Sequence, residues 1–185
     1  MTVFTDPSAW AIAHLARRLP DLSPDRLDEA EVVRWLRSAL HLSAGVRAPR
    51  DAARGEYTRT LIHSTPQFEV VLMHWMPCSA TRIHDHGGSR CWFAVANGSM
   101  AIQNFRRCDS AADAQYARIA AEASLELGLS EVDYRKDEID LHRCSTGEHS
   151  AVTLHLYARP LERFCVYDAA SGRISPATSH YDAVL

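Results

Sequence analysis

The stretch from Ile83 to Trp92, IHDHGGSRCW, holds the side chains best suited to chemistry. His84 and His86 are two residues apart, so on an extended strand both side chains point to one face. Two imidazoles on one face can take adjacent positions on a metal ion, although a surface strand with two solvated histidines has the same spacing. Cys91 follows in the same stretch and adds a thiol whose purpose the spacing leaves open.

A third metal ligand has to come from a later strand. His142, in DLHRC, is the best candidate, because a strand antiparallel to the first can bring it opposite the pair. Three neutral histidines leave a divalent ion its full charge, which favours an anionic ligand such as a thiolate. The same ligands can hold zinc for hydrolysis, so the spacing alone does not choose the metal.

The segment TLHLY alternates polar and apolar side chains. Thr153, His155 and Tyr157 share one strand face, and two leucines share the other. This pattern predicts a hydrogen-bonded relay in which Thr153 orients His155 and His155 orients the Tyr157 hydroxyl. A polar interior row without a function has the same pattern. A nucleophile and base at this spacing lack an acid partner and an oxyanion loop in the sequence.

Two further pairs at the same spacing are expected to line a binding pocket. Tyr57 and Arg59, in EYTRTL, share a strand face. An arginine that faces a barrel interior needs a counter-charge, which a substrate carboxylate or a structural salt bridge can supply. Met73 and Trp75 are expected to form a wall of this pocket.

The elements that position these residues begin with helices over residues 1–45. Asp6 can cap the first helix, with Pro7 at its first position. Ser23-Pro24 is expected to open a second helix that Gly45 closes, and residues 46–54 are expected to form a loop.

From residue 55 onward, short runs rich in Val, Ile, Tyr and Thr alternate with turn residues. Asn97-Gly98, between WFAVA and SMAIQNF, predicts a β-hairpin. The density of short strands predicts an antiparallel barrel or sandwich. We therefore expect one domain over residues 1–185, with a helical cap at residues 1–45 and a β-barrel core at residues 55–170.

Composition narrows the classes of partner. The 185 residues are 46% hydrophobic and 23% charged, with a net charge of −3, which fits a globular protein and argues against nucleic acid as a partner. We expect no membrane span and no signal peptide, because the required apolar runs are missing. Five cysteines without C-x-x-C spacing favour a reducing, cytoplasmic setting, and we expect a monomer.

The motifs together resemble a known family. H-x-H, four residues, Cys91, six residues and Gly98 match the layout of the first cupin motif, in which a glutamate ligand usually stands at the position of Cys91. YTR, IHDHxxSxC, LHR and xLHLY occur in the order found in the cysteine dioxygenase family of thiol dioxygenases. The resemblance runs from the helical N-terminus to the last strand. It implies a mainly β cupin fold, a double-stranded β-helix or jelly-roll barrel, with an α-helical N-terminal cap.

The resemblance also implies an activity. Fe(II) would be held by His84, His86 and His142, and a small thiol would bind through its sulfur and amine while Arg59 pairs with its carboxylate. Both atoms of O₂ would pass to sulfur and give a sulfinate, with Tyr157 donating a hydrogen bond at the site. An arginine at position 59 favours L-cysteine as the substrate, because the branch of the family that prefers 3-mercaptopropionate usually carries glutamine there.

Cys91 has a further implied role. In family members with cysteine at this position, its sulfur becomes joined to the ring of the tyrosine that matches Tyr157. Because this sequence has both partners, the resemblance predicts a thioether between Cys91 and Tyr157.

Departures from the family pattern leave alternatives open. Ala158-Arg159-Pro160 replaces Ser-Pro-Pro, and Arg82 lies two residues before His84, so Arg159 is an expected substrate contact and Arg82 a second cation near the pocket. They fit another small thiol such as mercaptosuccinate, a cysteine-oxidising variant with a different product, or simple salt bridges. A zinc cupin isomerase or hydrolase and a non-catalytic ligand-binding cupin are the alternatives from other classes.

Overall fold

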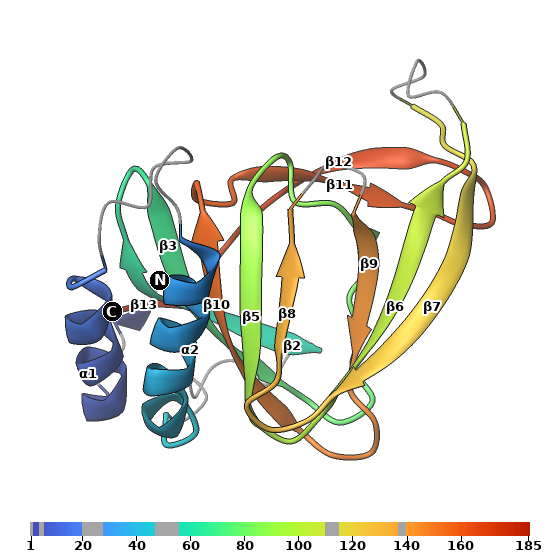
Figure 1. Cartoon of the computed structure of the whole chain (residues 1–185). Coiled ribbons are helices and arrows are strands. Elements are labelled where there is room, and N and C mark those ends of the chain that lie inside the picture. The colour runs from blue at the N-terminus through green and yellow to red at the C-terminus, as the bar shows by residue number, and fades with distance from the viewer. Residues whose placement is uncertain (1, 4–5, 20–27, 47–55, 110–114, 137–139) are drawn as a thin grey trace.

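Two β-sheets face each other in the computed structural model, which describes residues 2–3, 6–19, 28–46, 56–109, 115–136 and 140–185 (Figure 1). In that part of the chain the first sheet has the order β1 (Thr2–Val3), β13 (Ala183–Val184), β2 (Tyr57–Ser64), β3 (Phe68–Trp75), β10 (Ala151–Ala158), β5 (Arg90–Asn97), β8 (Val132–Arg135). The second has the order β12 (Ile174–Thr178), β11 (Arg163–Tyr167), β4 (Ile83–His84), β9 (Leu141–Ser145), β6 (Met100–Arg107), β7 (Ile119–Leu127).

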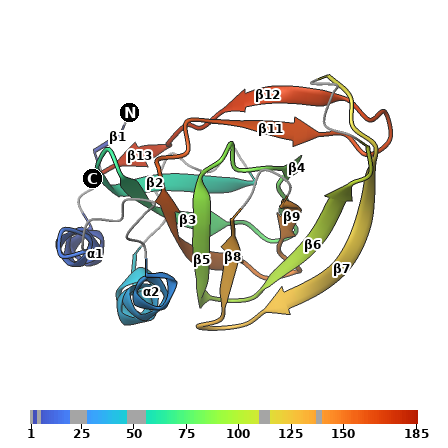
Figure 2. The same ribbon diagram turned by 45° about the horizontal axis from the view of Figure 1, so that its top comes forward.

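The pairing of these strands is antiparallel except for the short β1–β13 and β13–β2 pairs. Figure 2 shows the sheets curving around a common interior, with both helices outside the first sheet. The prediction of a mainly β jelly-roll barrel with a helical N-terminal cap is confirmed. Strands β12 and β13 lie beyond residue 170, where the core was expected to end.

The helices begin where capping residues place them. Helix α1 (Pro7–Ala16) is capped by Asp6, whose carboxylate accepts from the Ser8 N–H at 2.8 Å, as predicted. Helix α2 (Glu29–Ser43) is capped by Asp28, which accepts from the Ala30 N–H at 2.9 Å. The Ser23-Pro24 start and most of the expected loop over residues 46–54 lie outside the described residues.

Alternation along the strands divides the apolar side chains into two clusters. Leu72 on β3, Trp92 on β5 and Leu154 on β10 point outward and pack with Ile12 and Leu36 of the helices. The neighbouring positions point into the barrel and form a second cluster, which contains Val71, Met73, Trp75, Cys91, Phe93, Val95 and Tyr157. The helices therefore keep the outer face of the first sheet dry, and its inner face is free to carry a site.

The hairpin predicted at Asn97-Gly98 is wrong. Strand β5 pairs with β10 and β8, and β6 pairs with β7 and β9, so the turn carries the chain from one sheet to the other. The turn itself was predicted correctly, because Gly98 has a left-handed backbone with φ +75°. Closure of the whole barrel decides which strands pair, and a two-residue turn motif carries no information about it.

His84 and His86 were expected on one continuous strand, yet β4 contains only Ile83 and His84. His86 follows the strand, before the turn at Gly87-Gly88. No helix in the described ranges is long and apolar enough to cross a membrane.

We predict that Gly98→Ala destabilises the fold. A Cβ at residue 98 would lie 2.6 Å from the Ser150 carbonyl oxygen, and φ is +75°, so we expect a loss of about 1–3 kcal/mol in the free energy of unfolding. Urea unfolding followed by circular dichroism measures it. Gly147→Ala is the matched control, because an added Cβ there meets nothing within 4 Å. Equal stability of the two variants would contradict the prediction.

Candidate active site

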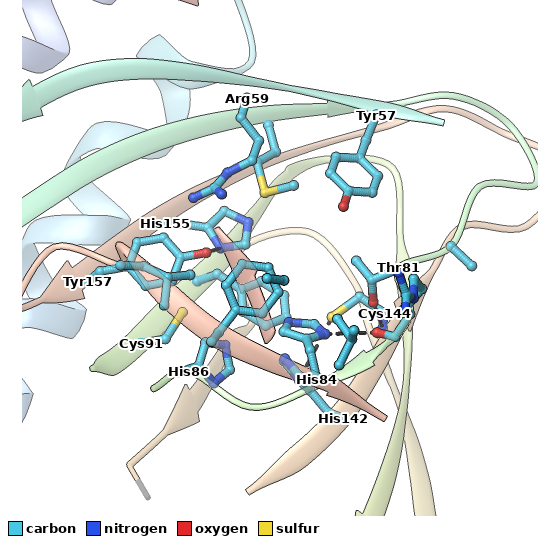
Figure 3. A pocket seen from close by; sticks show the side chains of 18 of the residues that line it. Tyr57, Arg59, Thr81, His84, His86, Cys91, His142, Cys144, His155 and Tyr157 are labelled. Atoms are coloured by element: carbon cyan, nitrogen blue, oxygen red, sulfur yellow. Dashed lines mark hydrogen bonds between the residues drawn. The ribbon is translucent and has the colours of Figure 1, made fainter. Parts of the chain in front are cut away.

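One cavity of about 310 Å³ lies inside the barrel between the two sheets. Figure 3 shows Arg59 on one side of it and the three histidines on the other, with His155 and Tyr157 between them. The cavity lies at the lower end of the volumes of small-molecule sites. Side chains from both sheets line it, so closing the barrel is what assembles it.

The three histidines form a tight group. His84 on β4 and His142 on β9 are directly opposed cross-strand partners, and His86 follows β4. The ring centroids of His84 and His142 are 4.6 Å apart, and those of His86 and His142 are 4.9 Å apart. Nitrogen atoms of the three rings lie within 4.8 Å of one another. This arrangement allows three imidazoles to bind one ion.

The electrostatics of the group suit a cation. Burial lowers the pKa of all three rings, so each is neutral at neutral pH. His84 Nδ1 donates to the Arg82 carbonyl oxygen at 2.9 Å, which leaves the lone pair on Nε2. In the described part of the chain, His86 Nδ1 and His142 Nε2 are buried without a hydrogen-bond partner. Three neutral imidazoles, two of which have a buried nitrogen without a hydrogen-bond partner in the described structure, fit the ligand set of a non-haem metal ion.

Two side chains lie near Nδ1 of His142: Cys144, whose Sγ is 3.8 Å away, and Asp133. Asp133 Oδ2 lies 3.9 Å from His142 Nδ1. The same carboxylate oxygen accepts from Arg135 Nε at 2.7 Å. At 3.9 Å this carboxylate is beyond hydrogen-bond distance of the ring, so it acts on His142 through its charge, while Arg135 fixes the carboxylate itself.

Strand register places the other predicted residues around the cavity. Arg59 on β2 and Thr153 on β10 are both partners of Met73 on β3, so the three lie in one row across the sheet. Tyr157 on β10 is the partner of Cys91 on β5. Tyr57, Arg59, Met73, Trp75, Cys91, His155 and Tyr157 all line the cavity.

Thr153, His155 and Tyr157 are joined by hydrogen bonds. Thr153 Oγ1 lies 2.8 Å from His155 Nε2, and His155 Nδ1 lies 3.3 Å from the Tyr157 hydroxyl. Trp75 Nε1 donates to Thr153 Oγ1 at 2.8 Å, a contact that the sequence did not indicate. Thr153 is fully buried behind the cavity, where it supports His155.

Burial sets the protonation of this chain of groups. It lowers the pKa of His155 to about 3, so the ring is neutral at neutral pH. Burial, with Cys91 nearby, raises the pKa of Tyr157 well above its usual value, so the phenol keeps its proton. Burial also raises the pKa of Cys91, which stays a thiol.

Arg59 is a buried cation, and two of its three guanidinium nitrogens have no hydrogen-bond partner among the described residues. Its side chain is 7% exposed, and Nη1 donates to Ser179 Oγ at 2.6 Å. Nε and Nη2 are buried with no hydrogen-bond partner among the described residues. These two nitrogens form one edge of the guanidinium, which can donate two parallel hydrogen bonds to a carboxylate.

Arg159 lies elsewhere, and its expected contact with substrate needs correction. Its side chain is exposed and is not among those that line the cavity in the described structure. Residue 159 follows the end of β10 with φ +64°, and its carbonyl oxygen accepts from Ser89 Oγ at 2.5 Å. The left-handed backbone at residue 159 ends the strand alternation, and the chain returns to the cavity at Leu161. Arg82 does line the cavity, at an exposed position.

Sequence reasoning missed several lining residues. Cys144 lines the cavity and is buried, which raises its thiol pKa to about 12. Its position two residues after His142, on the same strand face, was the available signal. His180 also lines the cavity, and Ser179 beside it binds Arg59. No pattern in the sequence connected this segment with the site.

Curated proteins with related sequences match about two thirds of this chain. Cysteine dioxygenase type 1 of Homo sapiens and that of Mus musculus are each 26% identical over 125 residues, which is 66% of this chain and 60% of theirs. The chain thus spans less than two thirds of the length of these curated relatives. A Klebsiella pneumoniae protein with a double-stranded β-helix domain superposes with a TM-score of 0.44 at 14% identity, over 83% of this chain and 91% of that chain.

A family description covers far more of the chain than these pairwise matches. The model of the family "Cysteine dioxygenase type I" matches residues 2–170, a range that contains all three histidines, Arg59 and Tyr157. The match extends from the first described strand to the end of β11. The chain therefore belongs to the cysteine dioxygenase type I family.

Proposed function

We propose that this protein is an Fe(II)- and O₂-dependent thiol dioxygenase that oxidises L-cysteine to cysteine sulfinate. One observation carries the proposal: Arg59, whose Nε and Nη2 have no hydrogen-bond partner among the described residues, lines the same cavity as the three neutral histidines. A cation edge that suits a carboxylate and a metal site that suits a thiolate fit a small thiol acid. Membership of the family supports the same activity.

His84, His86 and His142 would hold the iron, because they are the neutral donors grouped in the cavity. When bound, Fe(II) would supply affinity for a thiolate and a redox centre through which O₂ can react with sulfur, while the sulfur itself provides the four electrons. The reaction adds both atoms of O₂ to the thiol group, so it balances without an external reductant. The protein has to position the substrate, exclude water and hold protons.

Arg59 positions the substrate. Its Nε and Nη2 donate to the two carboxylate oxygens of L-cysteine, which compensates a buried charge that otherwise has no partner at these atoms. The carboxylate is then fixed on one side of the cavity, and the thiol is directed to the histidines on the other side (Figure 3). Met73 and Phe93 form apolar walls that exclude water.

Tyr157 holds a proton at the cavity. The Trp75 indole N–H can only donate, so the Thr153 oxygen accepts it and the Thr153 O–H is available to His155 Nε2. Neutral His155 then carries its proton on Nδ1 and donates it to the Tyr157 oxygen. The Tyr157 O–H is left to donate to the substrate carboxylate or to oxygen that is adding to sulfur.

A second substrate is favoured by one observation. Arg82 lines the cavity at an exposed position, so a thiol with a second carboxylate, such as mercaptosuccinate, has a cation available at the rim.

A reducing, cytoplasmic setting fits the chemistry, because it keeps the substrate thiol and the free cysteines reduced. We also propose that the enzyme acts as a monomer.

Oxygen uptake by the iron-loaded protein tests the proposed reaction. Protein loaded anaerobically with Fe(II) should consume O₂ when L-cysteine is added, and mass spectrometry should find the sulfinate. His142→Ala should lose both bound iron and O₂ uptake, because a metal ligand is gone. His149→Ala, at an exposed position, is the control and should keep both.

The same assay separates the rival functions. O₂ uptake with mercaptosuccinate or 3-mercaptopropionate but not L-cysteine would keep the reaction class and change the substrate. A different oxidised product would indicate a cysteine-oxidising variant. Absence of thiol-dependent uptake would refute the dioxygenase. Hydrolase or isomerase activity of the zinc-loaded protein would then support a zinc cupin, and ligand binding alone a non-catalytic one.

Thr153→Val should lower kcat while KM for L-cysteine stays nearly constant. The substitution keeps the shape but removes the acceptor of Trp75 and the donor to His155, so the proton of Tyr157 is no longer directed. We expect a loss of roughly tenfold, which is about 1.4 kcal/mol on the barrier. Thr153→Ser should restore the rate. Thr60→Val, at another buried threonine, should leave kcat unchanged.

We further propose that Cys91 and Tyr157 become joined by a thioether. They are buried partners on adjacent strands, and the Cys91 thiol lies beside Tyr157 (Figure 3). The bond forms between sulfur and a ring carbon, and O₂ takes the two hydrogen atoms that leave. After turnover, peptide mapping should find one linked peptide lighter by two hydrogen atoms. Cys91→Ser should show separate peptides; separate peptides in turned-over wild type would disprove the link.

A further inference from the structure

A tail segment, residues 179–182, supplies several of the contacts of Arg59 and lies outside the range that the family model matches. This tail segment lies between β12 and β13, and β13 runs beside β2 (Figure 2). The Arg59 N–H donates to Asp182 Oδ2 and the Asp182 N–H donates to the Arg59 carbonyl oxygen, each at 2.8 Å. The backbone of Arg59 is therefore fixed on both of its polar groups.

The side chain of Arg59 is held by the same segment. Nη1 donates to Ser179 Oγ at 2.6 Å, and the Ser179 N–H donates to the Glu162 carbonyl oxygen at 2.9 Å. The Tyr181 ring lies 5.5 Å from the guanidinium carbon, and the Tyr157 ring lies 5.9 Å from it. Cation–π contacts at these distances attract a guanidinium to the two rings.

Tyr181 is itself anchored by a buried carboxylate. Glu69, on β3, is 1% exposed, and its Oε2 accepts from the Tyr181 hydroxyl. The other oxygen, Oε1, accepts from the Leu161 N–H at 3.2 Å. Glu69 thus fixes Tyr181, while the Nε–Nη2 edge of Arg59 is left unpaired in the described structure.

We propose that the tail segment determines substrate specificity, with Ser179 and Tyr181 as positioning residues for Arg59. By occupying Nη1 and one face of the guanidinium, they direct its Nε–Nη2 edge to the cavity, so the site selects thiols that carry a carboxylate. Without these contacts a long, flexible side chain has several rotamers, and the pair of parallel donors is lost. This inference rests on the proposed function, because it assigns a carboxylate to the substrate.

Ser179→Ala tests the positioning. Steady-state O₂ uptake is measured with L-cysteine and with cysteamine, which has the same thiol and amine but no carboxylate. We expect KM for L-cysteine to rise about tenfold, as for loss of one hydrogen bond to a charged group, with kcat nearly constant. The kinetic constants for cysteamine should not change, whether it is a good or a poor substrate. Ser179→Thr keeps the hydroxyl and should restore KM, and Ser175→Ala, on β12, is the matched control.

Calorimetry under anaerobic conditions measures binding without turnover, so it tests the positioning of Arg59 separately from the proposed oxidation reaction. The dissociation constant of L-cysteine from the Fe(II)-loaded protein should rise about tenfold in Ser179→Ala. A wild type that binds L-cysteine without consuming O₂ would overturn the reaction, while the weaker binding of the variant would still support the positioning. Equal affinity of wild type and variant, or an equal loss with cysteamine, would overturn the positioning. A wild type that binds no L-cysteine would overturn both.

Discussion

The register of β10 between β3 and β5 is the constraint on which the site depends. Leu154 and Leu156 point outward to the helices, and Thr153, His155 and Tyr157 point inward. Because side chains alternate, a slip of one residue would exchange these faces and expose the leucines to the cavity. Apolar packing on the outside of the sheet therefore fixes which polar groups meet on the inside.

The site combines groups that are costly to bury. Arg59 has two buried nitrogens without a partner in the described structure, and His86 and His142 each have one. An unpaired buried polar atom costs about 1–3 kcal/mol, so the folded state is less stable than an apolar interior would make it. A cation would take one nitrogen of each histidine ring, and a carboxylate at Arg59 would satisfy Nε and Nη2. The proposed ligands would therefore offset part of the cost of this polar interior.

Features that depend on local spacing were predictable from sequence. The TLHLY alternation and the Asp6–Pro7 helix start arise from side-chain periodicity and from capping. The two histidines of the H-x-H pair do meet at the cavity, although His86 lies beyond β4. Pairings set by the whole barrel were not predictable. Asn97-Gly98 correctly indicated a turn, but the partners of β5 and β6 are chosen by closure of two sheets. Arg159 was expected at the site because it replaces a proline of the family pattern, a comparison that does not report its left-handed backbone. Ser179 had no nearby motif to associate it with Arg59.

The contact between Arg59 and Ser179 joins residues that are 120 positions apart. A ribosome makes β2, β3 and all three histidines well before it makes residue 179. The growing chain therefore contains every group of the metal site while its arginine has no support from β13 or from the tail segment. Because β13 pairs with β2, the contact between Arg59 and Ser179 can form only once these last described strands have joined the sheet.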